Sequence, residues 1–172
     1  MMSQKMQDAL NEQINAEWYS SYLYLAMCSY LTSVNLTGMA TWMRVQTQEE
    51  MFHGIKMYDF VNERGGRAIL QAIDQPPSVW DSALSVFENG LAHEQKVTVL
   101  INYLVDLSMT ERDHATTIFL QWYVTEQIEE ESNASAIVSK LKMIGHDASS
   151  LFALDQELGQ RIFILPASAA LQ

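Results

Sequence analysis

The sequence is poor in the residues that interrupt helices or cross-link chains. Its 172 residues include 7 Gly, 3 Pro and a single Cys. Because Gly and Pro break helices, their scarcity leaves long uninterrupted stretches and favours an all-α fold. Cys28 alone excludes both an internal disulfide and a zinc site built from cysteines, and it is typical of a reducing compartment.

Positive charge is also scarce. The chain has 10 Lys and Arg against 21 Asp and Glu, a formal net charge of −11. Such an acidic chain repels phosphate backbones, which argues against nucleic-acid partners and for cations. The sequence also has no apolar run near the about 20 residues that span a bilayer, and no apolar stretch of a signal peptide at its start. We therefore expect a cytoplasmic protein without a membrane partner.

The length and the positions of the helix breakers predict one domain over residues 1–172. Four long helices are expected at residues 3–31, 37–63, 78–106 and 110–144. Gly65 and Gly66 end the second helical stretch, and Pro76 and Pro77 precede the third, where Ser78 resembles a helix cap. A long connection therefore separates these helices, as in a four-helix bundle (residues 3–144) with one long crossover.

A short fifth helix is predicted over residues 147–163. Asp147 is a typical helix cap, and apolar residues follow it at spacings of three and four. These residues are Leu151, Leu154, Leu158 and Ile162. One face of the fifth helix is therefore apolar, which is typical of a helix that docks on another surface.

Each predicted bundle helix carries a carboxylate in the middle of its apolar seam. These carboxylates are Glu17, Glu50, Glu94 and Glu130. Because the seams of a bundle face its core, the four charges are expected to be buried together, where they repel one another. No Lys or Arg occupies a seam position, but two divalent cations would balance the charges. His53, one turn after Glu50, adds an imidazole, and this oxygen-rich set favours iron or manganese over structural zinc.

Further motif residues surround these carboxylates. They are Tyr24, the segment EEMFH at residues 49–53, Trp122 and the segment EQIEE at residues 126–130. Together with the four seam carboxylates, they resemble the ferroxidase motifs of the non-haem bacterial ferritins, within the ferritin-like di-iron carboxylate proteins. The resemblance extends over essentially the whole chain. It implies an iron-storage protein that oxidises Fe(II) with O2 or H2O2 and keeps Fe(III) as mineral inside a twenty-four-subunit cage.

The resemblance assigns the ligands of a ferroxidase centre that holds two irons per subunit. It implies that Glu17, Glu50 and His53 hold the first iron. It implies that Glu50, Glu94 and Glu130 hold the second, so that Glu50 bridges the two. The predicted activity is that of an Fe(II):oxygen oxidoreductase.

Three more acids, Glu49, Glu126 and Glu129, match a third iron site in the bacterial family. The alternative is that they are ordinary exposed acids. The resemblance implies that Gln127 contacts the iron ligands without binding iron itself. Tyr24 and Trp122 are either electron donors to bound oxygen, as the resemblance suggests, or ordinary core aromatics.

Haem is disfavoured. The haem-containing branch of the family would place a second Glu-x-x-His motif on the fourth helix, whereas residues 127–130 read QIEE. Met51 lies near the position of that branch's haem-binding methionine. In a chain with 10 Met, however, a core-filling role is the default.

Two other functions remain open. A di-iron oxygenase or a peroxide-reducing bundle would use the same ligands on another substrate, but such enzymes often need an electron-transfer domain, for which the chain has no room. A purely structural bundle with incidental acids does not explain four seam carboxylates without a counter-charge.

Overall fold

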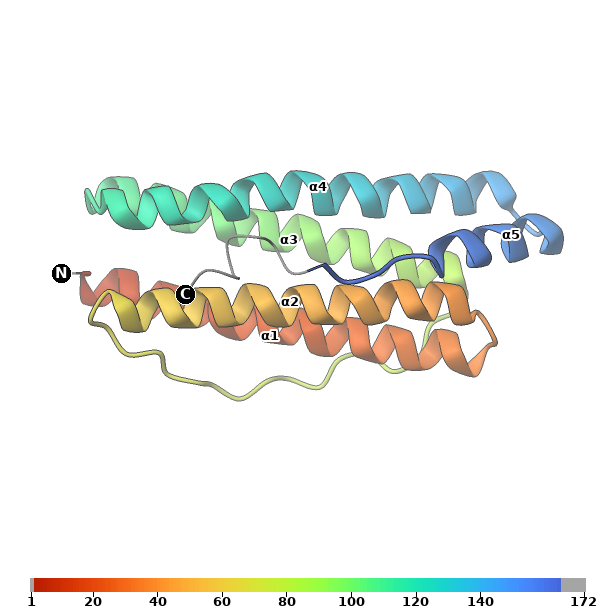
Figure 1. Cartoon of the computed structure of the whole chain (residues 1–172), viewed down its shortest axis with the longest axis horizontal. Coiled ribbons are helices and arrows are strands. Elements are labelled where there is room, and N and C mark those ends of the chain that lie inside the picture. The colour runs from red at the N-terminus through yellow and green to blue at the C-terminus, as the bar shows by residue number, and fades with distance from the viewer. Residues whose placement is uncertain (1, 165–172) are drawn as a thin grey trace.

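The structure, a computed structural model, describes residues 2–164, which form helices joined by turns and one long connection (Figure 1). The bundle consists of α1 (Gln4–Ser33), α2 (Thr37–Glu63), α3 (Ala83–Thr110) and α4 (His114–Ile144), and α5 is Ala148–Leu158. The predicted all-α bundle with one long crossover and a short fifth helix is confirmed. Of the helices described, none is both long and apolar enough to cross a membrane.

The predicted start of the third helix was wrong by about one turn. Helix α3 begins after Ser82, whose hydroxyl accepts the N–H of Ser85, while the Ser85 hydroxyl accepts the N–H of Ser82. This reciprocal capping box satisfies two amide donors that would otherwise be unpaired. Ser78, the predicted cap, lies in the crossover instead.

Two other predicted boundaries also shift. Helix α4 begins after Asp113 rather than at residue 110, because the Asp113 carboxylate caps the helix and Arg112 before it has a positive φ of 56°. Helix α3 accordingly continues to Thr110. Helix α5 ends at Leu158, before Gly159, so that Ile162 lies outside the helix and is 72% exposed.

The crossover is held against α1 by a row of amide side chains spaced four residues apart. The Gln7 side chain accepts the N–H of Arg67 at 3.0 Å. Asn11 donates to the carbonyl of Arg67 and accepts the N–H of Ile69. Asn15 donates to the carbonyl of Ala72 at 3.0 Å. Because residues four apart share one helix face, these side chains form a single track for the connection.

The buried apolar side chains of the described residues form two clusters at opposite ends of the bundle. The cluster at the α5 end includes Leu31, Met39, Met43, Phe87 and Leu141. The cluster at the other end includes Met6, Leu10, Met57, Ile101 and Leu120. Burying such side chains contributes about 1.5–3 kcal/mol each. The layer between the clusters contains the polar midpoints of the four seams.

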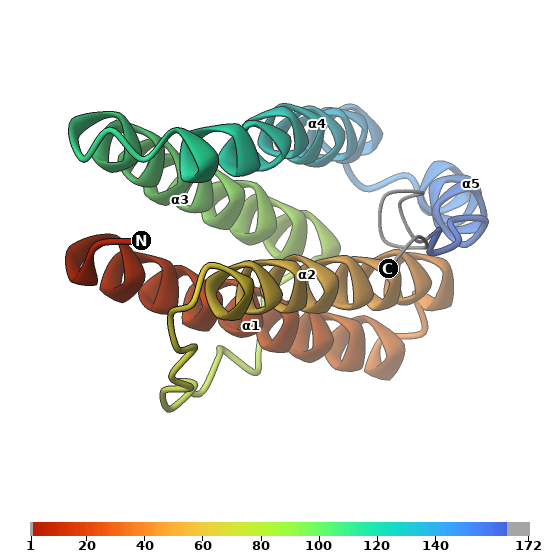
Figure 2. The same ribbon diagram turned by 60° about the vertical axis from the view of Figure 1, so that its left-hand side comes forward.

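Helix α5 closes one end of the bundle and caps α2 (Figure 2). Leu36 at the start of α2 makes no capping hydrogen bond through its side chain. The buried Asp155 carboxylate replaces that cap, because it accepts the N–H groups of Gly38 at 3.1 Å and Met39 at 2.8 Å. A Cβ on Gly38 would lie 1.7 Å from the Asp155 carbonyl oxygen, so only glycine permits this approach.

We predict that Asp155→Ala lowers the free energy of unfolding by about 2 kcal/mol, because it leaves two amide donors of α2 without their charged acceptor. Hydrogen exchange at the amides of Gly38 and Met39 should accelerate. Asp147→Ala is the control, since Asp147 caps only the exposed start of α5 through Ser150. Unchanged exchange at Gly38 and Met39 in Asp155→Ala would contradict the capping role.

Candidate metal centre

The four seam carboxylates lie in the polar layer between the apolar clusters, one on each bundle helix. Their exposed fractions are 1% for Glu17, 2% for Glu50, 1% for Glu94 and 4% for Glu130. His53 on α2 is equally buried, at 3%. The heptad reasoning therefore placed these five side chains correctly, because the seam of each helix turns inward at its midpoint.

Two sets of ligand atoms come together within 4.8 Å among the described residues. One set is Glu17, Glu50 and His53, as predicted for the first iron, and the other is His53, Glu126 and Glu130. His53 faces both sets: its Nδ1 lies 3.5 Å from a carboxylate oxygen of Glu50, and its Nε2 lies 3.9 Å from one of Glu126. Each set combines carboxylate oxygens with an imidazole nitrogen, which suits iron.

Glu94 is held by hydrogen bonds from two side chains. The Tyr24 hydroxyl donates to one of its carboxylate oxygens, and Gln127 Nε2 lies 3.3 Å from the other. Glu94 therefore does not join either set of ligand atoms in this structure. Its charge nevertheless acts on the neighbouring acids, since it raises the pKa of Glu130.

Two glutamines orient the carboxylates of α1 and α2. Gln13 donates to Glu17 Oε1 at 2.8 Å, and Gln46 donates to Glu50 Oε1 at 2.9 Å. Both glutamines stand four residues before their glutamate, so each pair spans one helical turn. The other oxygen of Glu17, Oε2, is buried and has no hydrogen-bond partner among the residues that the structure describes. A bound cation would satisfy this oxygen.

Burial and mutual repulsion raise the pKa values of these carboxyl groups. Burial first, and then the charge of Glu50, raises the pKa of Glu17 to about 8 and that of Glu94 to about 8. Burial and the charge of Glu94 raise the pKa of Glu130 to about 8. Burial and Glu130 raise the pKa of Glu50 well above its usual value. Protons therefore neutralise the layer at neutral pH when no metal is bound.

Aromatic side chains enclose His53 on the α4 side. The ring centroid of Trp122 lies 5.2 Å from that of His53, at an interplanar angle of 78°. The Tyr123 hydroxyl donates to the His53 carbonyl at 2.7 Å. Lys56 Nζ lies 4.4 Å from the centroid of Trp122. These contacts fix the segment of α2 that carries His53, and the aromatic rings exclude water from its imidazole.

The three acids predicted beside the centre lie where α2 and α4 face each other, and they are less buried. Glu49 and Glu126 are half-buried, whereas Glu129 is exposed. Burial raises the pKa of both Glu49 and Glu126, and Glu129 contributes to each shift by repulsion. Arg161, beyond the end of α5, pairs with Glu49 at 2.5 Å.

Sequence reasoning named Gln127, which lies beside Glu94, but it missed Gln13, Gln46 and Arg161. The spacing of Gln13 and Gln46 from their glutamates was a usable signal, since a glutamine four residues before a buried glutamate can hydrogen-bond to it. Arg161 had no such signal, because it reaches Glu49 from a segment 112 residues away.

Comparisons with known proteins agree with these observations. Residues 7–144 match the model of the ferritin-like domain family. A bacterial non-heme ferritin of Bacteroides fragilis (strain 638R) is 45% identical over 161 residues, which cover 94% of this chain and 100% of that protein. A bacterial non-heme ferritin of Staphylococcus saprophyticus is 40% identical over 163 residues, covering 95% and 98%.

Solved structures are similar as well. An open-pore ferritin from the hyperthermophilic archaeon Archaeoglobus fulgidus is 56% identical, with a TM-score of 0.93 over 94% of this chain and 100% of that one. A closed form engineered from the Archaeoglobus fulgidus ferritin has a TM-score of 0.94 at 56% identity, covering 95% and 100%. The similarity therefore includes the crossover and α5 as well as the bundle.

We predict that divalent metal binding releases several protons per chain near pH 7. The pKa values of Glu17, Glu94 and Glu130 are raised to about 8, so these groups are mostly protonated there, and a metal displaces the protons. The release should shrink as the pH rises above about 8, where the acids are already ionised. Anaerobic Fe(II) titration in buffers of different ionisation enthalpy measures it.

Glu17→Gln provides the control for this titration. It removes one of the titrating acids and should lower the number of released protons by about one. Metal binding without proton release near pH 7 would contradict the assignment of protons as the counter-charges of the metal-free layer.

Proposed function

The chain belongs to the ferritin family and is an iron-storage protein, and from that premise we propose that the buried polar layer is its ferroxidase centre. Fe(II) is the substrate, and each Fe(II) gives up one electron. O2 accepts two electrons and two protons to form H2O2, or H2O2 accepts them to form water. Fe(III) then moves on to be stored as mineral inside a cage. The observation that carries this proposal is the burial of four carboxylates with no buried Lys or Arg beside them in residues 2–164.

The proposed ligands follow from the positions of the carboxylates. Glu17, Glu50 and His53 hold one iron, and Glu50, Glu94 and Glu130 hold the other. A bridging role for Glu50 is supported by its charge, which after burial is the largest cause that raises the pKa of Glu17 on α1 and of Glu94 on α3. Glu94 turns from its hydrogen bonds with Tyr24 and Gln127 to join the second iron.

The third iron site is proposed where α2 and α4 face each other, at Glu49, Glu126 and Glu129. Its support is the proximity of Glu126 to His53 and Glu130, which places the acid directly beside the paired centre. An iron that leaves the paired centre between α2 and α4 can bind to these further carboxylates. The less buried position of these acids is consistent with a site of passage rather than of tight binding.

Tyr24 and Trp122 are proposed as electron donors during oxygen reduction. The Tyr24 hydroxyl donates its hydrogen bond to Glu94, so the hydroxyl proton can move to the carboxylate as the ring loses an electron. The Trp122 ring lies edge-on to His53. Both side chains therefore contact a proposed iron ligand directly.

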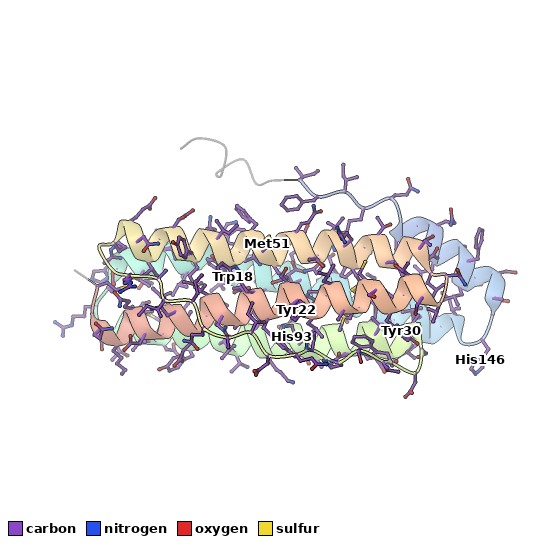
Figure 3. All side chains as sticks on the ribbon, turned by 90° about the horizontal axis from the view of Figure 1, so that it is seen from below. Trp18, Tyr22, Tyr30, Met51, His93 and His146 are labelled. Atoms are coloured by element: carbon purple, nitrogen blue, oxygen red, sulfur yellow. The ribbon has the colours of Figure 1, made fainter. Side chains whose placement is uncertain are left out.

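Assembly into a homo-oligomeric cage is supported by an apolar face of α1, α2 and the crossover (Figure 3). A hollow of about 430 Å³ there is lined by Trp18, Tyr22, Leu25, Met51 and Ile55, together with other residues. Tyr22, Met51 and Ile55 are each 45% exposed or more, so the default expectation that Met51 fills the core was wrong. Adjacent exposed side chains of this kind mark a surface that another protein covers. We propose a cage of twenty-four subunits, in the cytoplasm.

The function is tested by adding Fe(II) to the metal-free protein in air and weighing the product by sedimentation. Storage predicts large particles whose iron content far exceeds the two ions of the centre in each chain. Protein incubated in air without iron is the control. Small particles with two irons per chain would instead indicate an oxygenase.

The bridging role predicts an order among ligand substitutions. Glu50→Ala should slow rapid Fe(II) oxidation by about 10–100-fold more than Glu17→Ala, which strips only one metal of a ligand. The fold should survive, because removing a buried acid also removes repulsion. Stopped-flow absorbance measures the rate, and Glu88→Ala, at an exposed pair with Lys142, is the control. Equal, mild effects of Glu50→Ala and Glu17→Ala would contradict bridging.

A further inference from the structure

Arg161 reaches from the chain beyond α5 to the edge of the metal centre. Its Nη2 lies 2.5 Å from Glu49 Oε2, and its Nη1 donates to Gln46 Oε1 at 2.8 Å. The guanidinium also lies 4.3 Å from the centroid of the Trp42 ring. The ion pair, the hydrogen bond and the stacking hold the group in one orientation, although a fifth of its surface is exposed.

The contact with Gln46 connects Arg161 to an iron ligand. Because Arg161 donates to the carbonyl oxygen of Gln46, the amide nitrogen of Gln46 must point away, and it donates to Glu50 Oε1 at 2.9 Å. Arg161 thus holds one acid of the third site directly and one ligand of the paired centre through a glutamine.

Helix α5 delivers Arg161 to this position. Asp155 fixes α5 to the first amides of α2, and the helix ends at Leu158, three residues before the arginine. The chain then runs back along α2 (Figure 1), where Arg161 meets Glu49. Asp155 therefore anchors α5 at one end of α2, and the chain after α5 brings the Arg161 guanidinium to Glu49, near the middle of α2.

We propose that Arg161 is a positioning residue that takes the place of a metal cation at Glu49. It fixes the orientation of the Glu49 and Gln46 side chains, and it is displaced when an ion binds at Glu49. This inference rests on the third iron site of the proposed function. Arg161 occupies one oxygen of Glu49, so an ion that needs this carboxylate competes with the guanidinium. Displacing Arg161 breaks the contacts that hold the chain after Gly159, so binding loosens that segment.

The test is anaerobic calorimetric titration of the full, metal-free chain with Fe(II), which measures the affinities for successive ions. Arg161→Gln should bind the third ion about fivefold more tightly, the equivalent of one partly exposed ion pair, and should leave the number of ions in the paired centre unchanged. Arg161→Lys keeps the charge but not the fork that spans Glu49 and Gln46. Its third-ion affinity should stay near that of the parent.

Arg64→Gln is a matched control. Arg64 also pairs with a carboxylate, Asp113 at 3.0 Å, and lies 5.5 Å from an aromatic centroid, that of Phe60, but at the end of α2 away from α5. Its removal should not change third-ion affinity. A similar gain in Arg64→Gln would indicate a general charge effect and would overturn the assignment to Arg161.

Hydrogen exchange provides a second measurement that does not depend on a variant's folding. In the parent, the third Fe(II) should accelerate exchange at residues 159–163, and the first two should not. Equal third-ion affinity in parent and Arg161→Gln, or unchanged exchange in the parent, would overturn the role of Arg161 alone. Two ions and no third in either protein would overturn both the third site and this inference, while particles filled with iron would still establish storage.

Discussion

The burial of four carboxylates in one layer is the constraint on which the rest of the structure depends. Glu17, Glu50, Glu94 and Glu130 are each at most 4% exposed, and the apolar clusters on both sides offer them no counter-charge. Such a layer would strongly destabilise the fold if all four were ionised without a cation. Burial and mutual repulsion raise the pKa values of these groups, which favours their protonated forms, and glutamine donors satisfy individual oxygens. The bundle can therefore fold before iron arrives.

The bundle's two ends keep this layer in register. If the helices slid along one another, the four midpoints would no longer meet, so the long helices need fixed ends. Arg64 joins the end of α2 to the start of α4 through Asp113. At the opposite end, Asp155 joins α5 to the start of α2, and Leu154 is buried in the adjacent apolar cluster. These contacts lie far from the metal centre, and they act together with the two apolar clusters that pack the helices against one another.

Much of the fold and of the candidate site could be predicted from the sequence, because the signals were local and periodic. The spacing of apolar residues placed the four carboxylates and His53, and the scarcity of Gly and Pro indicated the helices. The start of α3 could not be predicted from Ser78 alone, because Ser82 and Ser85 form a reciprocal capping box that begins the helix about one turn later. Asp155 and Arg161 had no sequence signal, because each makes its contact with a segment more than 100 residues away. Periodicity within a helix carries no information about such pairs.

The buried layer and the acids beside it are neutralised in different ways, and on our proposal this difference bears on the order in which ions bind. In the buried layer the counter-charges are protons, which leave without moving the backbone. At Glu49 the counter-charge is Arg161, whose side chain is tied through the chain to α5. An ion entering the layer exchanges with protons, whereas an ion at Glu49 exchanges with an arginine and must break its contacts with Gln46 and Trp42. On our proposal the third ion therefore binds more weakly than the first two, as a site of passage requires, because part of its binding free energy is used to displace the guanidinium.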